Sequence, residues 1–170
     1  ILHRSSNVGT ILWAVDLGED RLYERLLDFG LGRSTELDFP GEASGILAAV
    51  GKWSGTSLPT IAIGQGVAVT PVQMVTAFST IANGGHRPAP TLILGTRDTT
   101  GVFQPADRAT TEQVIDPESA LQLLGMLERV VESGTGTRGQ VPGYRVAGKT
   151  GTAWKPRPEG GYGEGTGNID

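Results

Sequence analysis

Apolar residues recur at helical spacing in four stretches of the chain, and this pattern predicts four amphipathic helices. The stretches cover residues 7–17, 19–29, 71–83 and 116–133. A glycine directly follows each of them, which is where a helix commonly ends, because glycine adopts the left-handed backbone of a C-terminal cap without strain. We therefore expect helices to supply most of the regular structure.

The two later helices have the clearest starting points. A Thr-Pro pair at 70–71 and an Asp-Pro pair at 116–117 each combine a favourable N-cap with a proline, which suits the first helical position. Met74 begins the apolar stripe of the first of these helices, and Leu121 begins that of the second. We expect both stripes to be buried in the core.

Outside the helices, the sequence predicts a long connection and two strands. Turn-forming residues are dense over 32–59, so we expect little regular structure there. Residues 91–96 predict a short strand, and residues 144–154 predict a second one built mostly of small residues. Gly148 and Gly151 weaken this second strand unless something must approach its backbone closely, so it is a candidate binding edge.

Composition and charge allow a globular domain and exclude several classes of function. The chain has 170 residues, of which 38% are hydrophobic and 26 are glycine. Its net charge is −4 and it has no run of Lys or Arg, so we expect no nucleic-acid partner. It has no cysteine, and its two histidines, His3 and His86, are far apart in the sequence, so we expect neither a metal site nor a cofactor. The chain contains no run of about 18 apolar residues, so the sequence predicts no membrane span.

Two nucleotide-binding motifs match by letter but not by context. Residues 134–139 fit G-x-G-x-x-G, yet they follow a predicted helix instead of a strand. Residues 143–150 fit the P-loop pattern G-x-x-x-x-G-K-T, yet no apolar strand precedes them, and Pro156 and Pro158 stand where a helix would have to follow. We interpret the first match as a helix cap and turn, and we do not expect an NTPase.

A third pattern joins the two ends of the chain. Residues 5–7 fit S-x-N and residues 149–151 fit K-T-G, in the order found in penicillin-recognising serine acyltransferases. On these motifs and the segments between them, the chain resembles the transpeptidase domain of class B penicillin-binding proteins, the division or elongation type that cross-links peptidoglycan. The resemblance extends over nearly the whole chain, through segments 29–32, 64–74, 81–85, 133–136 and 146–153.

The resemblance implies catalytic roles for three residues. Ser5 would form part of the proton route to the leaving amine, because a hydroxyl both accepts and donates a proton. Asn7 would bind a backbone amide of the substrate and help to hold the catalytic lysine of the family. Lys149 would place a positive charge opposite the substrate carboxylate and assist proton transfer.

Three further residues would bind the substrate, by the same resemblance. Thr150 would hydrogen-bond the substrate carboxylate. Gly151, which lacks a Cβ, would let the acyl chain lie along the strand edge, and the Thr152 N–H would donate to the oxyanion. The ligands would be the D-alanyl-D-alanine end of a peptidoglycan stem peptide and the β-lactams.

The chain departs from the family at the nucleophile. None of its nine serines has a lysine three positions later, so the S-x-x-K motif is absent, and we expect it to precede Ile1. Residues 1–170 would then be a partial transpeptidase domain that is inactive alone, without the C-terminal strands of the family. Trp154 also stands where the family more commonly has a polar residue.

The implied fold is the α/β (α+β) fold of penicillin-binding proteins and β-lactamases. Within it, this chain would supply the helix-rich part and the K-T-G strand, and most of the central antiparallel sheet would be missing. The resemblance further implies a protein that a single N-terminal segment anchors in the cell membrane, with this domain outside the cytoplasm. A membrane glycosyltransferase and division or elongation proteins would be its partners.

Other interpretations of the same residues stay open at this point. Ser5 and Asn7 also suit helix capping, and Lys149 also suits an exposed position on a strand. A serine β-lactamase or a D,D-carboxypeptidase of the same fold would share both motifs. A non-catalytic binding module derived from that fold would also share them.

Overall fold

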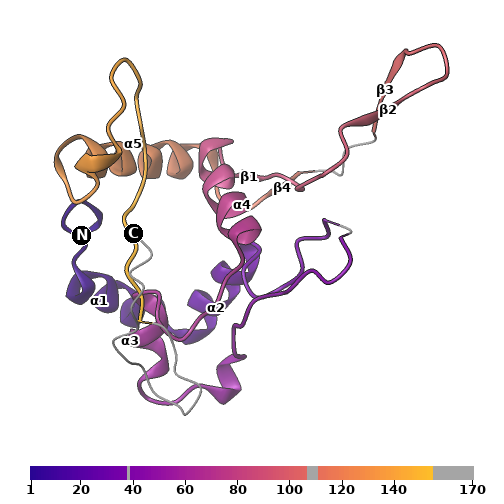
Figure 1. The fold of residues 1–170 in the computed structure, drawn as a ribbon. Coiled ribbons are helices and arrows are strands. Elements are labelled where there is room, and N and C mark those ends of the chain that lie inside the picture. The colour runs from indigo at the N-terminus through magenta and orange to yellow at the C-terminus, as the bar shows by residue number, and fades with distance from the viewer. Residues whose placement is uncertain (38, 107–110, 155–170) are drawn as a thin grey trace. The chain divides into compact units, whose positions relative to one another are not determined.

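The computed structural model describes residues 1–37, 39–106 and 111–154 (Figure 1). The chain forms two compact units, each assembled from segments that are far apart in the sequence. Unit 1 comprises residues 1–22, 48–67 and the chain from 122 onward, and unit 2 comprises residues 23–47 and 68–121.

The described part of unit 1 is built from helices and connecting loops. Its elements are η1 (Leu2–Arg4), α1 (Asn7–Leu17), η2 (Val50–Lys52), α3 (Ser57–Ala62), most of α5 (Pro117–Ser133) and η3 (Thr137–Gly139). Helix α1 packs against α3. The buried apolar side chains of unit 1 come from α1, α3 and α5, and they are Ala14, Ile61, Leu127, Val130 and Val131.

Unit 2 combines helices with two small antiparallel sheets. Its helices are α4 (Pro71–Ala82), α2 (Glu19–Asp28) without its first turn, and the start of α5. Strand β1 (His86–Arg87) pairs with β4 (Glu112–Gln113), and β2 (Gly95–Arg97) pairs with β3 (Phe103–Pro105). Helix α4 packs against β1, whereas β2 and β3 form a hairpin that projects from the unit (Figure 1).

A buried amide holds the start of α4 in place. Gln73 is completely buried, and its side-chain amide donates to the carbonyls of Arg33 (2.7 Å) and Ser44 (2.9 Å). Its Oε1 accepts from the N–H of Thr70 (2.8 Å), while the Thr70 hydroxyl accepts from the Gln73 N–H (3.2 Å) in a capping box. One side chain therefore joins the helix cap to two points of a distant loop.

Our expectation that the Met74 stripe forms core is wrong. Met74, Val75 and Phe78 are between 38% and 65% exposed, while the buried residues of α4 are polar. At Gln73 the physical reason is that the carbonyls of Arg33 and Ser44 need donors, which an apolar side chain does not supply. Helix α4 therefore turns its polar side inward within unit 2.

The four predicted helices are confirmed, each to within one residue at either end. The stripe that begins at Leu121 is confirmed only in its later part, because Leu121 itself is 69% exposed whereas Leu127, Val130 and Val131 are buried. The connection over 32–59 is mostly irregular, as expected, but it contains η2 and the start of α3. A helix of 6 residues is too short to show a helical period in the sequence.

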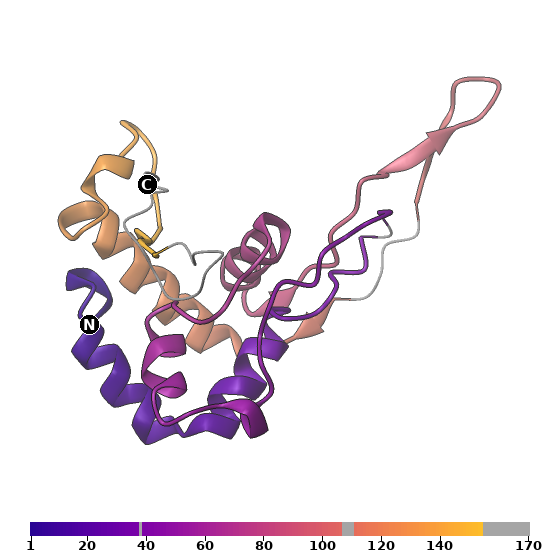
Figure 2. The same ribbon diagram turned by 60° about the horizontal axis from the view of Figure 1, so that its bottom comes forward.

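The predicted strands are largely wrong. The strand expected at 91–96 begins only at Gly95, and the described residues 144–154 form no strand. A strand requires a neighbour to complete its hydrogen-bond ladder, and no described segment pairs with residues 144–154. Instead the chain turns back after α5 and passes beside it (Figure 2), where the Gly148 N–H donates to the Leu127 carbonyl (3.3 Å).

Candidate active site

Ser5 lies in a tight turn between η1 and α1. It is the C-cap of η1, its backbone is left-handed (φ 54°), and its N–H donates to the Leu2 carbonyl (3.1 Å). The next residue, Ser6, is the N-cap of α1 and accepts from the N–H of Gly9 (3.2 Å). Because Ser6 caps the helix, the hydroxyl of Ser5 is available to another partner.

That partner is Lys149, from the far end of the chain. The Lys149 ammonium donates to Ser5 Oγ (2.7 Å) and to the Thr150 carbonyl (3.0 Å). The lysine is half-buried, and this desolvation lowers the pKa of Lys149 below its ordinary value. Among the described residues no carboxylate forms an ion pair with Lys149, so its charge is available to an anionic ligand.

Ser5 and Lys149 line a cleft of about 610 Å³ in unit 1. All six predicted site residues line this cleft, namely Ser5, Asn7, Lys149, Thr150, Gly151 and Thr152. Gln65 and Trp154 contribute to the wall as well. The sequence did not assign Gln65 to the site. The one feature that could have indicated it is its position between two glycines, in a segment that resembles the family.

The turn after α5 connects the two sides of this cleft. The Thr135 N–H donates to the carbonyl of His3 in η1 (3.3 Å), and the Thr150 hydroxyl donates to Thr135 Oγ1 (3.2 Å). Glycine at position 134 permits this approach, because a Cβ there would lie 2.6 Å from the His3 carbonyl oxygen. Thr135 was another residue that sequence reasoning did not place in the site.

The structure also decides between the motif interpretations. Residues 134–139 form the turn that caps the end of α5 and the helix η3, which confirms the predicted cap and turn. No helix follows Thr150 within the described residues, so the P-loop motif lacks the helix N-terminus that would bind a phosphate.

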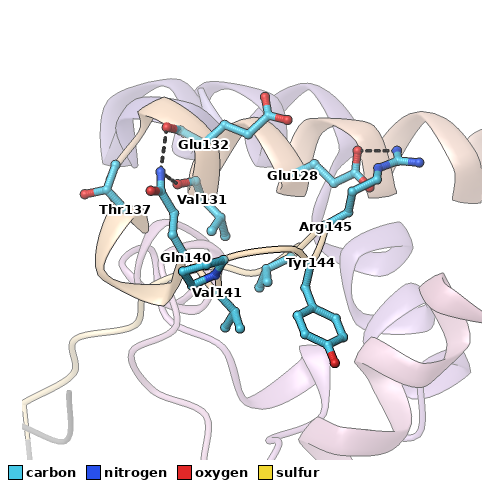
Figure 3. Close-up of a pocket in the computed structure, with 10 residues that line it drawn as sticks. Glu128, Val131, Glu132, Thr137, Gln140, Val141, Tyr144 and Arg145 are labelled. Atoms are coloured by element: carbon cyan, nitrogen blue, oxygen red, sulfur yellow. Dashed lines mark hydrogen bonds and ion pairs between the residues drawn. The ribbon is translucent and has the colours of Figure 1, made fainter.

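A second cavity, of about 550 Å³, lies between α5 and the loop that follows it (Figure 3). There Glu128 and Arg145 form an ion pair (2.7 Å), and this hydrogen bond raises the pKa of Arg145. The Gln140 amide donates to two carbonyls in the last turn of α5 (3.0 and 2.9 Å; Figure 3). No predicted site residue lines this cavity, but its contacts fasten to α5 the loop that leads to Lys149.

Comparison with known proteins gives one consistent result. The family model for the penicillin binding protein transpeptidase domain matches residues 1–168. Penicillin-binding protein PbpB of Mycolicibacterium smegmatis is 41% identical over 93% of this chain, and peptidoglycan D,D-transpeptidase FtsI of Escherichia coli K12 is 33% identical over 95% of it. In each case the match covers 26% of the relative's length, so this chain spans about a quarter of these proteins.

Solved structures lead to the same family. Penicillin binding protein 3 of Mycobacterium tuberculosis, in complex with ampicillin, superposes with a TM-score of 0.90 at 36% identity. The match covers 96% of this chain and 38% of that chain. The described helices and small sheets are consistent with a partial domain of this fold.

Proposed function

Because the chain belongs to the penicillin-binding protein transpeptidase family, we propose that residues 1–170 supply part of the active site of a peptidoglycan D,D-transpeptidase. The observation that carries this proposal is the 2.7 Å contact between Lys149 Nζ and Ser5 Oγ in the wall of the cleft. Two motifs at opposite ends of the chain meet there, and they leave a positive charge beside a hydroxyl. Acyl transfer from a peptide that ends in a carboxylate uses both groups.

In the proposed reaction, a serine outside residues 1–170 attacks the carbonyl of the penultimate D-alanine. The C–N bond breaks, an acyl-serine forms, and the terminal D-alanine leaves as an amine. Ser5 passes to that amine the proton that the attacking serine gives up, and Lys149 stabilises the negative charge that develops on Ser5 Oγ during this transfer through its 2.7 Å hydrogen bond. Asn7, which lines the same cleft, binds the amide of the acyl chain.

The remaining site residues bind the ends of the substrate in this proposal. The hydroxyl of Thr150 and the ammonium of Lys149 donate charge-assisted hydrogen bonds to the terminal carboxylate. Gly151 leaves room for the peptide backbone, and the Thr152 N–H donates to the oxyanion. A β-lactam would occupy the same positions with its carboxylate and its strained amide.

None of the alternative functions is favoured. The relatives described above are named as penicillin-binding proteins or D,D-transpeptidases, and the solved structure with ampicillin is one of a penicillin-binding protein.

No helix in the described part of the chain is long and apolar enough to cross a membrane. We propose that the anchor lies outside residues 1–170, that this domain is extracytoplasmic, and that a membrane glycosyltransferase and division or elongation proteins are its partners.

The direct test of this function is acylation of the full-length protein by a fluorescent penicillin. We expect a stable covalent adduct that persists through denaturing electrophoresis, and cross-linking of a stem peptide that ends in D-alanyl-D-alanine. Rapid release of hydrolysed penicillin would instead indicate a β-lactamase. Absence of any adduct would indicate a binding module.

Residues 1–170 alone are expected to form no adduct with a fluorescent penicillin. None of the nine serines has the lysine three positions later that the nucleophile of this family requires. The measurement is mass spectrometry of the isolated chain after incubation, with the full-length protein as the positive control. An acyl group found on any serine of residues 1–170 would contradict the prediction.

The rate of acylation is expected to fall at alkaline pH with a midpoint below the ordinary lysine pKa of about 10.4. Burial lowers the pKa of Lys149, so its ammonium loses a proton, and with it the charge that attracts the carboxylate, earlier than an exposed lysine would. The pH profile of kcat/KM in the full-length protein measures this, and Lys149→Arg should lose the alkaline limb. A midpoint at or above that of an ordinary lysine would contradict it.

A further inference from the structure

Thr135 lies outside both sequence motifs, yet it is bonded to the segments that carry them. Its N–H donates to the His3 carbonyl in η1, two residues before Ser5, and its hydroxyl accepts from the hydroxyl of Thr150. We infer that Thr135 is a positioning residue that orients the Thr150 hydroxyl toward the carboxylate of the substrate. This inference rests on the proposed function, which assigns that carboxylate to Thr150.

The chemistry of a hydroxyl group explains why Thr150 needs such a neighbour. A hydroxyl has one proton to donate and two lone pairs that accept. In the structure Thr150 donates its proton to Thr135 over 3.2 Å. When a carboxylate accepts a hydrogen bond from Thr150 in place of Thr135, the Thr150 hydroxyl rotates and its lone pair accepts from the Thr135 hydroxyl. This reversal requires rotation about the two C–O bonds only, and each proton stays bonded to its own oxygen.

This reversal gives a chain of two hydrogen bonds that ends on the carboxylate. A hydroxyl that accepts a hydrogen bond is a stronger donor, because successive bonds polarise one another. Lys149 Nζ lies 3.5 Å from Thr150 Oγ1 and supplies a second, longer contact to the same oxygen. Thr135 and Lys149 thus approach Thr150 together and leave its proton for the ligand.

Thr135 suits this role because its own backbone is fixed. The turn that holds it continues from α5, where the N–H groups of Gly134 and Gly136 both donate to the Val130 carbonyl (3.1 and 2.9 Å). Val130 is completely buried. Thr150, by contrast, lies in a segment with no strand partner among the described residues. The better-anchored residue therefore orients the less anchored one.

The test compares variants of the full-length protein in acylation by a penicillin, with KM and the limiting acylation rate measured separately. Thr135→Val keeps the shape of the side chain but removes the hydroxyl. It is expected to raise KM about tenfold, because the Thr150 hydroxyl loses the partner that orients it toward the carboxylate, and to change the limiting rate less than about twofold. Thr135→Ser restores the hydroxyl and is expected to stay within about twofold of wild type in KM.

A double variant separates this role from a merely structural one. If Thr135 acts through Thr150, then Thr135→Val adds little to the defect of Thr150→Val. Thr137→Val is the matched control, because Thr137 is an exposed threonine of the next turn that does not line the cleft. It is expected to leave KM unchanged.

The outcomes distinguish a failure of the proposed function from a failure of the positioning role of Thr135. A wild-type protein that no penicillin acylates overturns the proposed function, and this inference with it. An acylated wild type combined with a Thr135→Val variant of unchanged KM overturns the inference alone. Equal defects in the serine and valine variants, or full additivity with Thr150→Val, also overturn it.

Discussion

Replacing Lys149 by alanine in the full-length protein is expected to lower the second-order rate of acylation by penicillin at least about a thousandfold. The variant loses the hydrogen bond to Ser5 and the unpaired positive charge of the cleft. Lys149 is half-buried and makes no ion pair among the described residues, so the free energy of unfolding should change by no more than about 1 kcal/mol. Stopped-flow acylation and thermal melting measure the two quantities.

Lys52→Ala is the control for this experiment. Lys52 is an exposed lysine at the end of η2 and does not line the cleft, so its loss should leave acylation unchanged. Ser5→Ala tests the other end of the same hydrogen bond and should also lower acylation by orders of magnitude. Acylation of the Lys149→Ala variant at the wild-type rate would remove the basis of the proposed site.

Replacing Gln73 by methionine is expected to lower the free energy of unfolding by about 3–5 kcal/mol, because three backbone groups lose a partner. Methionine has a similar size but cannot donate to the carbonyls of Arg33 and Ser44 or accept from the Thr70 N–H. Gln73 is completely buried, so water cannot readily replace these bonds. Urea unfolding of the full-length protein measures the change.

Two further variants make this result specific. Gln104→Met, at an exposed position in strand β3, should change stability by less than about 0.5 kcal/mol. Gln73→Glu keeps an acceptor but loses the amide donors, so it should be destabilised about as much as Gln73→Met. A Gln73→Met protein as stable as wild type would mean that unit 2 does not depend on this amide.

Local signals in the sequence predicted the helices well. The Thr-Pro pair at 70–71 marks the start of α4, and the structure completes it with a capping box to Gln73. Whether Gln73 or Met74 faces the interior was not predictable in this way. The carbonyls that bind Gln73 belong to residues 29 and 40 positions away, and a helical period carries no information about such partners.

The site was predicted through two motifs, and the structure shows what those motifs lack. Ser5 and Asn7 both suited a helix cap, but the structure assigns capping to Ser6 and leaves Ser5 to Lys149. Thr135 is bonded to the site through its N–H, which donates to the His3 carbonyl, and through its hydroxyl, which accepts from Thr150. The cap-and-turn composition of residues 134–139 did not predict these contacts. The strand expected at 144–154 failed because a ladder depends on a neighbour, which the composition of one segment does not specify.

In the proposed function, the left-handed backbone of Ser5 makes activity and stability favour different residues at this position. A residue with a Cβ pays about 1 kcal/mol to adopt this conformation, whereas glycine adopts it freely. Selection for folding alone would thus favour glycine at the end of η1. The hydroxyl that reaches Lys149 comes with a conformational penalty, which the helices on either side of the turn must offset.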